Sequence, residues 1–440
     1  MMETLRKLIE QLDQEGNLEK VTQQISTKYE APYILKEYDG RKAVFFSNVK
    51  GYDIPIVGNL CCRRDFIAKG LNVSTDKLAD RILYGIRNPI KPKIVEDGPS
   101  QEKIEGEVNL HKLPVLMHYE YDKAPYITSG IVIAKDPETD RLNASYHRMM
   151  VIGKNRLVAR LVEGRDLHRF YIAAKKKKMT LEVAVVIGAP PALLVAASTS
   201  PGQLNEIDVA GGLLNTPLEM VKCKSVDLIA PRYAEIVLEG RLTLENAPEG
   251  PFVDITGAYD IIRDQPILEV NLVTHRIDAI YQALLPGGYE HLLLMGLPKE
   301  AKILEATRSV GKVLDAALTL AGSNWLDAAI LIKKTHPHEP FLIGLAAISA
   351  HPSLKRIVIV DEDVNVRDLL SIEKAVIERA HPVNDYLVIN HIKGSSLDKS
   401  ILRGKGETEL TPAKVIIDAT IKGDKMYYEL GKIPRPKSQE

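Results

Sequence analysis

The apolar positions of the first hundred residues alternate between helical and strand spacing. Residues 5–16 place their leucines and isoleucine on one helical face and end at a glycine. Residues 43–46 form a short apolar run typical of a strand, and residues 77–85 again have helical spacing. A stretch rich in proline and glycine follows at residues 88–99, where a boundary is expected. We therefore predict an N-terminal α/β segment over residues 1–105.

The middle of the chain has the pattern of an antiparallel sheet. An apolar run at residues 127–134 is followed by a polar turn at 136–140, whose Asp-Pro-Glu-Thr-Asp sequence is typical of a chain reversal. Apolar residues resume at 142–152 and, after a Gly-Lys-Asn turn, at 157–162. These runs predict an antiparallel meander in a strand-rich domain over residues 106–295.

Two features of this middle part resemble other signals and have simpler explanations. The four consecutive lysines at 175–178 resemble a nucleic-acid tract, but they fall where a helix from about residue 167 should end, and cations stabilise that end of a helix. The most apolar stretch, residues 181–198, contains Glu182 and two adjacent prolines. It therefore predicts a buried strand, a turn and a helix start, and not a membrane span.

Helical and strand patterns alternate over the last part of the chain. Residues 300–321 have long helical periodicity up to Gly322. Three short apolar runs then predict strands, with helices between them, at 326–332, 357–360 and 386–389. This alternation predicts an α/β C-terminal domain over residues 296–440.

The overall composition excludes several classes of partner and favours the cytoplasm. Lys plus Arg and Asp plus Glu number 58 each over 440 residues, so no global field attracts nucleic acid or an anionic membrane surface. The three cysteines include the adjacent pair Cys61-Cys62. An odd and sparse set of this kind is expected in a reducing compartment.

Asn143 and Glu206 are candidate ligands for a hard cation. Amide and carboxylate oxygens suit Mg²⁺ or Mn²⁺, which bind few protein groups and complete their shell with phosphate and water. The alternative for such residues is an ordinary strand position and a partner for a helix N-terminus. Asn143 and Arg148 are an odd number of residues apart, so in a regular strand they would point to opposite faces. To share a site they need a bulge, a strong twist or a large ligand.

Glu249 and Asp254 lie on either side of a Gly-Pro turn. Two carboxyls held in this way can face one cavity, where crowding or burial keeps a proton on one of them. The alternative is an exposed acidic turn. The spacing alone leaves both open.

Six short motifs, taken in order, resemble the UbiD family of decarboxylases, which use prenylated flavin mononucleotide. The resemblance runs from about residue 114 to 420. Its markers are the sequences at 124–128 (Ala-Pro-Tyr-Ile-Thr), 145–148 (Ser-Tyr-His-Arg), 234–240 (Ala-Glu-Ile-Val-Leu-Glu-Gly), 248–251 (Pro-Glu-Gly-Pro), 360–368 (Val-Asp-Glu-Asp-Val-Asn-Val-Arg-Asp) and 414–420 (Lys-Val-Ile-Ile-Asp-Ala-Thr).

The resemblance implies a mixed α/β fold with a strand-rich split-barrel flavin-binding domain and an α/β C-terminal domain. It implies prenylated FMN and Mn²⁺ as cofactors, with K⁺ left open. The metal ligands would be Asn143, Glu206 and a third group, either Asp166, where many relatives have histidine, or the nearby His168. The flavin-binding residues would be Ser145, Tyr146, His147, Arg148, Arg160, Leu161, Val162, Arg165, Asp166 and Lys414.

The same resemblance assigns the chemistry to Glu249, Arg148 and Asp254, with Asp254 as proton donor. The flavin takes up the electrons left by CO₂, while protein groups position and protonate. Arg148 can bind a substrate carboxylate in bidentate fashion. That carboxylate and the two protein carboxyls would place three negative charges around one guanidinium. We therefore expect one proton to stay on a carboxyl at neutral pH.

Within the family, the chain is most similar to archaeal enzymes that convert trans-anhydromevalonate 5-phosphate to isopentenyl phosphate in the mevalonate pathway. The alternatives are an aromatic acid decarboxylase or carboxylase and, in another class, a flavin carrier without turnover. The substrate carries two anionic groups, so we expect a second patch of cations or N–H donors, for which residues 286–291 are a candidate. We also expect a homo-oligomer that receives its prenylated FMN from a separate flavin prenyltransferase.

Overall fold

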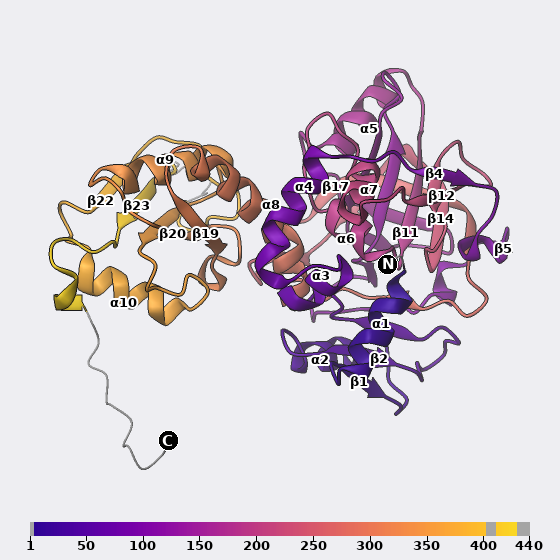
Figure 1. Cartoon of the computed structure of the whole chain (residues 1–440). Helices are drawn as coiled ribbons and strands as arrows, with labels where there is room; N and C mark the ends of the chain where they lie inside the picture. Colours follow the sequence, from indigo (N-terminus) through magenta and orange to yellow (C-terminus); the bar gives the residue numbers. More distant parts are fainter. Residues whose placement is uncertain (1–3, 402–410, 429–440) are drawn as a thin grey trace, which may run out of the picture. The chain divides into compact units, whose positions relative to one another are not determined.

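Two compact units form the chain in the computed structural model, which describes residues 4–401 and 411–428 (Figure 1). The first unit is Met1–Pro298 and the second is Lys299–Glu440. The three-part division with boundaries at residues 105 and 295 stays a prediction.

The first unit is built on a nine-stranded sheet. Its strand order is β6-β9-β10-β17-β14-β11-β7-β8, with β5 paired to β17. All these pairings are antiparallel. The bounds are β5 Lys103–Glu105, β6 Tyr126–Ile127, β7 Ile131–Lys135, β8 Leu142–Tyr146, β9 Met149–Val151, β10 Arg156–Ala159, β11 Leu181–Ile187, β14 Ile236–Glu249 and β17 Arg263–His275.

The chain passes between two distant positions of this sheet at His147 and Arg148. β8 is the last strand at one side of the strand order, yet β9, which follows after two intervening residues, is the second strand from the other side. The sheet must therefore curl toward closure, and the predicted split barrel is confirmed as a curled antiparallel half-barrel. The prediction of one strand over 142–152 is wrong, because the chain leaves β8 to join β10 through β9. The hairpins β7–β8 and β9–β10 are as expected.

Helices cover the curled sheet and confirm several sequence predictions. α5 packs on β7, β8 and β11, whereas α7 packs on α4, α6 and β8. The apolar stretch 181–198 forms β11, a turn and α6, as predicted, and the lysine run ends α5. The helices of this unit include α1 Leu5–Gln14, α2 Glu30–Glu37, α3 Arg64–Gly70, α4 Leu78–Arg87, α5 Asp166–Lys176, α6 Pro191–Ala196 and α7 Glu206–Leu214. No helix in the described ranges is long and apolar enough to cross a membrane.

Three smaller sheets complete the first unit. One has the order β1-β2-β3-β18 and another the order β13-β12-β4, while β15 and β16 form a short hairpin. That hairpin follows β14 directly and so carries its residues to the end of the curled sheet where β14 finishes. The bounds are β1 Leu18–Val21, β2 Ala43–Phe46, β3 Ile56–Gly58, β4 Lys93–Val95, β12 Glu219–Lys222, β13 Ile229–Pro231, β15 Phe252–Val253, β16 Tyr259–Asp260 and β18 Tyr281–Gln282.

The second unit is an α/β domain with a five-stranded sheet in the order β19-β20-β21-β23-β22. The predicted strands at 326–332, 357–360 and 386–389 are confirmed. The predicted helix over 300–321 is wrong beyond Arg308, because 313–318 pairs with β20 as an edge strand. The apolar spacing of residues 313–318 is compatible with a helix or a strand, and the pairing with β20 selects the strand. The bounds are α8 Tyr289–Arg308, which spans both units, β19 Val313–Leu318, β20 Asp327–Ile332, α9 Glu339–Ala350, β21 Arg356–Val360, α10 Leu369–Arg379, β22 Tyr386–Ile389 and β23 Lys414–Asp418.

Candidate active site

Asn143 on β8 and Glu206, the first residue of α7, meet inside the first unit. Each is 2% exposed. Glu206 accepts hydrogen bonds from the Asn143 side-chain amide at 3.2 and 3.1 Å and from the backbone N–H of Ala144 at 2.9 Å. These donors are neutral, and burial raises the pKa of Glu206 to about 7. A buried carboxylate without a cationic hydrogen-bond partner is a favourable place for a cation.

A chain of hydrogen bonds continues from Asn143 along β8 to the end of β10. The Ser145 hydroxyl lies 2.8 Å from the Asn143 amide oxygen and 3.0 Å from Nε2 of His147. Nδ1 of His147 lies 2.8 Å from the carbonyl oxygen of Arg160. Burial lowers the pKa of His147 to about 4. His147 therefore links the two predicted flavin-binding segments through both ring nitrogens.

Asp166, the predicted third metal ligand, lies near Glu206 but has two arginine partners. It forms ion pairs with Arg141, at 3.0 Å, and with Arg169. Burial acts to raise the pKa of Asp166, but the hydrogen bonds from these arginines outweigh it and the pKa is lowered. Nδ1 of His168, the alternative ligand, accepts from the Gly164 amide at 3.4 Å. Within the described ranges, no group of three or more His, Cys, Asp and Glu side chains could hold a metal ion.

Arg148 and Glu249 form the predicted pair at the opposite end of β8. The Nε and Nη2 atoms of Arg148 each donate to one Glu249 oxygen at 2.9 Å. Glu249 is fully buried and also accepts from the Tyr126 hydroxyl at 3.1 Å. The Arg148 guanidinium lies over the Phe252 ring, 4.5 Å from its centroid. Asn143 and Arg148, which are an odd number of residues apart, would point to opposite faces of one regular strand. They need not do so here, because Arg148 lies beyond the last residue of β8.

Glu249 occupies the two donors of Arg148, Nε and Nη2, that a bidentate contact with a substrate carboxylate would use. The Nη2 atom of Arg148 also donates to Asp260 at 3.0 Å. In the part of the chain that the structure describes, Nη1 donates no hydrogen bond. The predicted bidentate contact with a substrate carboxylate would therefore require displacement of a protein carboxylate, whereas Nη1 could be approached directly.

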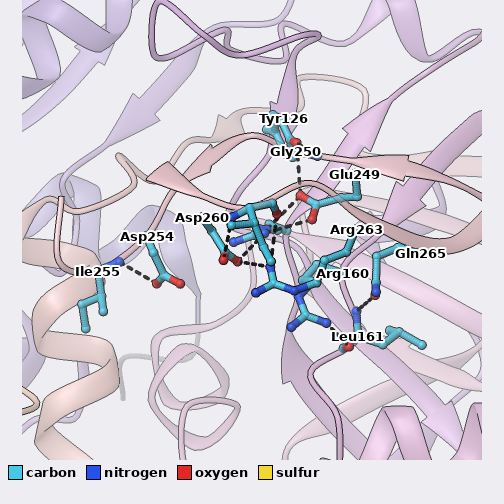
Figure 2. Close-up of polar contacts among 12 residues, drawn as sticks. Tyr126, Arg160, Leu161, Glu249, Gly250, Asp254, Ile255, Asp260, Arg263 and Gln265 are labelled. Atoms are coloured by element: carbon cyan, nitrogen blue, oxygen red, sulfur yellow. Dashed lines mark hydrogen bonds and ion pairs between the residues drawn. The ribbon is translucent and has the colours of Figure 1, made fainter. Parts of the chain in front are cut away.

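Asp260 and Arg263 belong to this network and were not among the predicted site residues (Figure 2). Asp260 ends β16 and forms an ion pair with Nη1 of Arg263 at 2.7 Å. Burial acts to raise the pKa of Asp260, but the two arginines lower it overall. The sequence offered one sign of Asp260, a carboxyl that follows the Pro-Glu-Gly-Pro motif within about ten residues. Spacing could not show that the hairpin brings residue 260 back to Arg148.

Asp254 lies on the same hairpin but outside these ion pairs. Its carboxylate accepts from the backbone N–H of Ile255 at 2.6 Å (Figure 2). A Cβ on Gly287, which has a φ of +68°, would lie 3.3 Å from the Asp254 carbonyl oxygen. Burial lowers the pKa of His291, while Asp254 acts to raise it and Arg148 to lower it. The candidate segment 286–291 therefore borders Asp254.

The remaining predicted flavin-binding residues lie in different surroundings. Tyr146 ends β8 with a buried hydroxyl that has no hydrogen-bond partner in the described ranges. Leu161 is buried and its N–H donates to Gln265, whereas Val162 and Arg165 are exposed. Lys414 begins β23 of the second unit, where its ammonium donates to the carbonyl oxygens of Pro352, at 2.6 Å, and Leu354. Its contact with a flavin phosphate stays a prediction.

Comparison with known proteins identifies the class to which this fold and site belong. The chain matches the N-terminal domain of 3-octaprenyl-4-hydroxybenzoate carboxy-lyase over residues 9–85, its Rift-related domain over 93–289 and its C-terminal domain over 292–419. The chain therefore belongs to the UbiD family, and it is a carboxy-lyase.

Individual relatives narrow this class. The chain is 40% identical to anhydromevalonate phosphate decarboxylase of Methanothermobacter thermautotrophicus over 94% of its own length and 96% of the relative. It is 39% identical to the Methanosarcina mazei enzyme of the same name, with 95% and 96% covered. Among solved structures, the UbiD-class enzyme HmfF from Pelotomaculum thermopropionicum in complex with FMN has a TM-score of 0.93. Its identity is 33%, with 98% of this chain and 97% of that chain covered.

Proposed function

We propose that this chain decarboxylates trans-anhydromevalonate 5-phosphate to isopentenyl phosphate with prenylated FMN. The observation that carries the proposal is the near full-length similarity to two enzymes named for this activity. The buried Arg148–Glu249 pair, with Asp254 beside it, supports turnover over simple flavin carriage, since a carrier needs only the phosphate and metal contacts. The 26% identity to the 3,4-dihydroxybenzoic acid decarboxylase of Enterobacter cloacae makes an aromatic substrate the weaker alternative.

In the proposed reaction Arg148 orients the substrate carboxylate and Asp254 supplies the proton. Glu249 and Asp260 fix the guanidinium on one side, so its Nη1 nitrogen is directed to the substrate. Asp254 has no cationic hydrogen-bond partner in the described ranges, unlike the other two carboxylates. We therefore assign to Asp254 the delivery of the proton to the carbon that has lost CO₂. When bound, the prenylated flavin supplies the electron sink for that loss.

The hydrogen bonds around His147 support a cation beside Glu206. A carbonyl oxygen only accepts, so Nδ1 of His147 carries a proton toward Arg160. With its pKa lowered to about 4, the ring is neutral at pH 7, and its Nε2 accepts from the Ser145 hydroxyl. The Ser145 proton is then not available to the Asn143 amide oxygen, which lies 2.8 Å from the Ser145 oxygen. With a cation bound, we propose that the Asn143 amide lies a half-turn away, with its nitrogen donating to Ser145 and its oxygen facing Glu206.

Two oxygen acceptors facing each other in a buried site favour a cation between them. In the structure the Asn143 amide nitrogen faces Glu206. A half-turn of the amide group exchanges its nitrogen and oxygen and gives the proposed orientation. An amide oxygen and a carboxylate suit Mn²⁺, and we assign that ion to Asn143 and Glu206. The third ligand, Asp166 or His168, stays open, as does K⁺.

Residues 145–148, 160–162 and 165–166 would hold the flavin, and Asn143 and Glu206 would hold the Mn²⁺ that accompanies its phosphate. A related UbiD-class enzyme has been solved with prenylated FMN, in an evolved dimeric form. That structure supports the cofactor proposal, and its dimeric form agrees with the predicted homo-oligomer. Supply of the cofactor by a separate flavin prenyltransferase remains part of the proposal.

Release of CO₂ from defined acids tests the proposed function. Holoenzyme produced together with a flavin prenyltransferase is given the phosphorylated acid, its dephosphorylated form and cinnamate-like or hydroxybenzoate-like acids at equal concentration. We expect the phosphorylated acid to react far faster than the others. Faster turnover of the aromatic acids would replace this proposal with the aromatic alternative. Absence of turnover with full flavin content would favour the carrier.

A further inference from the structure

Arg148 and Arg263 share one carboxylate oxygen. Nη2 of Arg148 donates to Oδ2 of Asp260 at 3.0 Å, and Nη1 of Arg263 lies 2.7 Å from the same atom. The two guanidinium nitrogens therefore cannot be farther apart than these two distances together. Figure 2 labels Asp260 and Arg263 within this network, near Glu249. Two fixed cations at this short separation can bind two anionic groups of one small molecule.

The sheet places Arg263 on the reactive side. Arg263 is the first residue of β17 and lies directly opposite Glu249 in the β14–β17 ladder. Side chains of directly opposed residues project from the same face of a sheet, and Glu249 projects to Arg148. Arg263 therefore reaches the site from the same face, with 30% of its side chain exposed.

The nitrogens of Arg263 are only partly used. Nη1 pairs with Asp260 and donates to the carbonyl oxygen of Ile261 at 3.2 Å. Nε and Nη2 donate no hydrogen bond in the described part of the chain. Two arginines balance Glu249 and Asp260, so the network itself is neutral. The unused N–H groups of Arg263 are available to an anion that enters beside Arg148.

Other nearby arginines are less suitable. Arg160 donates to Glu163 through both terminal nitrogens and to the carbonyl oxygen of Leu161. Arg165 precedes Asp166, which lies near Glu206 at the metal end of the site. Arg263 is thus the cation with free donors that lies next to the substrate-binding arginine.

We infer that Arg263 binds the phosphate of the substrate, with Asp260 holding it at a fixed separation from Arg148. This inference rests on the proposed function, because it assigns the remote anionic group of that substrate to a residue. Arg148 receives the carboxylate and Arg263 the phosphate. Arg263 then selects phosphorylated acids, while Arg148 serves every acid that reacts.

The test compares two acids in four holoenzymes. The kcat/KM values for the phosphorylated and dephosphorylated acids are measured in the unchanged enzyme and in Arg263→Gln, Arg263→Lys and Arg156→Gln. Arg156 is the matched control, because it lies on β10 of the same sheet and its ion pair, among the described residues, is with the exposed Glu245. Binding of isopentenyl phosphate and of isopentenol is measured by calorimetry on the same proteins.

Arg263→Gln should lower the preference for the phosphorylated acid about 10- to 100-fold, mostly through KM, as expected for lost charged hydrogen bonds. Binding of isopentenyl phosphate should weaken by a similar factor, and binding of isopentenol should not change. Arg263→Lys should lie between, since it keeps the charge without the planar fork. Arg156→Gln should keep the preference.

An equal loss for both acids in Arg263→Gln would overturn the inference, because it would mean that Arg263 only balances Asp260. An unchanged preference would also overturn it. If Arg263→Gln does not fold, Arg263→Lys decides by the same ratio. If the unchanged enzyme reacts with neither acid, the proposed function fails. In that case the binding of isopentenyl phosphate tests the phosphate-binding role of Arg263 independently of turnover. Equal binding by all four proteins would reject that role.

Discussion

The two ends of the predicted flavin site both contain a buried glutamate, but the two carboxylates are compensated differently. Glu249 has a bidentate arginine and belongs to a network in which two cations face two anions. Within the described ranges Glu206 has no cationic hydrogen-bond partner, and burial raises its pKa to about 7. One end is balanced by charges of the chain itself, and the other would be balanced by the proposed cation.

This difference assigns separate tasks to the two ends. A carboxylate held by both donors of a guanidinium fixes the position of that guanidinium, which suits orientation of a substrate. A carboxylate without one is stabilised when a divalent ion arrives, which suits capture of a phosphate-bearing cofactor. Asp254 lies beside the balanced end and, among the residues that the structure describes, has no cationic hydrogen-bond partner, so it is the carboxyl that we propose for proton transfer.

The largest expected effect is on turnover, from Asp254→Asn. This change keeps shape but removes the transferable proton, so kcat should fall about 10²–10⁴-fold with the flavin retained. Asp264→Asn, at an exposed position on β17, is the control and should keep kcat. Steady-state CO₂ release and the flavin absorbance measure both quantities. Near-normal kcat in cofactor-loaded Asp254→Asn would remove Asp254 from the role of donor.

A smaller effect is expected on stability, from Glu249→Ala. The change leaves a largely buried guanidinium without its bidentate partner, which should lower the free energy of unfolding by about 3–5 kcal/mol. Glu245→Ala on the same strand removes the exposed partner of Arg156, and should lower it by less than about 1 kcal/mol. Urea unfolding of the flavin-free proteins measures both. Equal losses would contradict the claim that the Glu249 end is held by its charges.

The smallest effect concerns Glu290, a third buried carboxylate. It is 1% exposed, accepts from the Cys61 amide at 3.0 Å, and burial raises its pKa to about 8. Between its ordinary value near 4.5 and about 8 the folded protein binds more protons than the unfolded chain. This group's contribution to stability is therefore lost as pH rises through that range, on the order of 1–3 kcal/mol. The free energy of unfolding is measured at pH 5 and pH 8 for the unchanged protein and for Glu290→Gln, and the variant should lose less stability between the two pH values. An equal loss in both proteins would contradict this assignment.

The sequence predicts most elements of the fold and the order of the site segments. Apolar spacing and turn residues locate α1, the β7–β8 hairpin and the alternating C-terminal unit. It does not predict the strand at 313–318, because edge pairing with β20 outweighs helical spacing. Periodicity also cannot show the break after Tyr146, since the closure of the sheet imposes it.

The site was predicted as far as its motifs extend. Asn143 with Glu206 and Arg148 with Glu249 are in contact as the resemblance implies. Asp260 and Arg263 could not be predicted, because only the folded hairpin brings them to Arg148. The use of the bidentate edge of Arg148 by Glu249 is likewise a property of the packed structure.

Manganese and flavin content of purified Asn143→Ala tests the central claim most directly. Elemental analysis and absorbance are compared for the unchanged protein, Asn143→Ala and Glu249→Gln, all produced together with a flavin prenyltransferase. The account predicts that Asn143→Ala stays folded but loses both Mn²⁺ and flavin, whereas Glu249→Gln keeps both and loses activity. Full Mn²⁺ and flavin in Asn143→Ala would contradict the assignment of the cation to this end of the site.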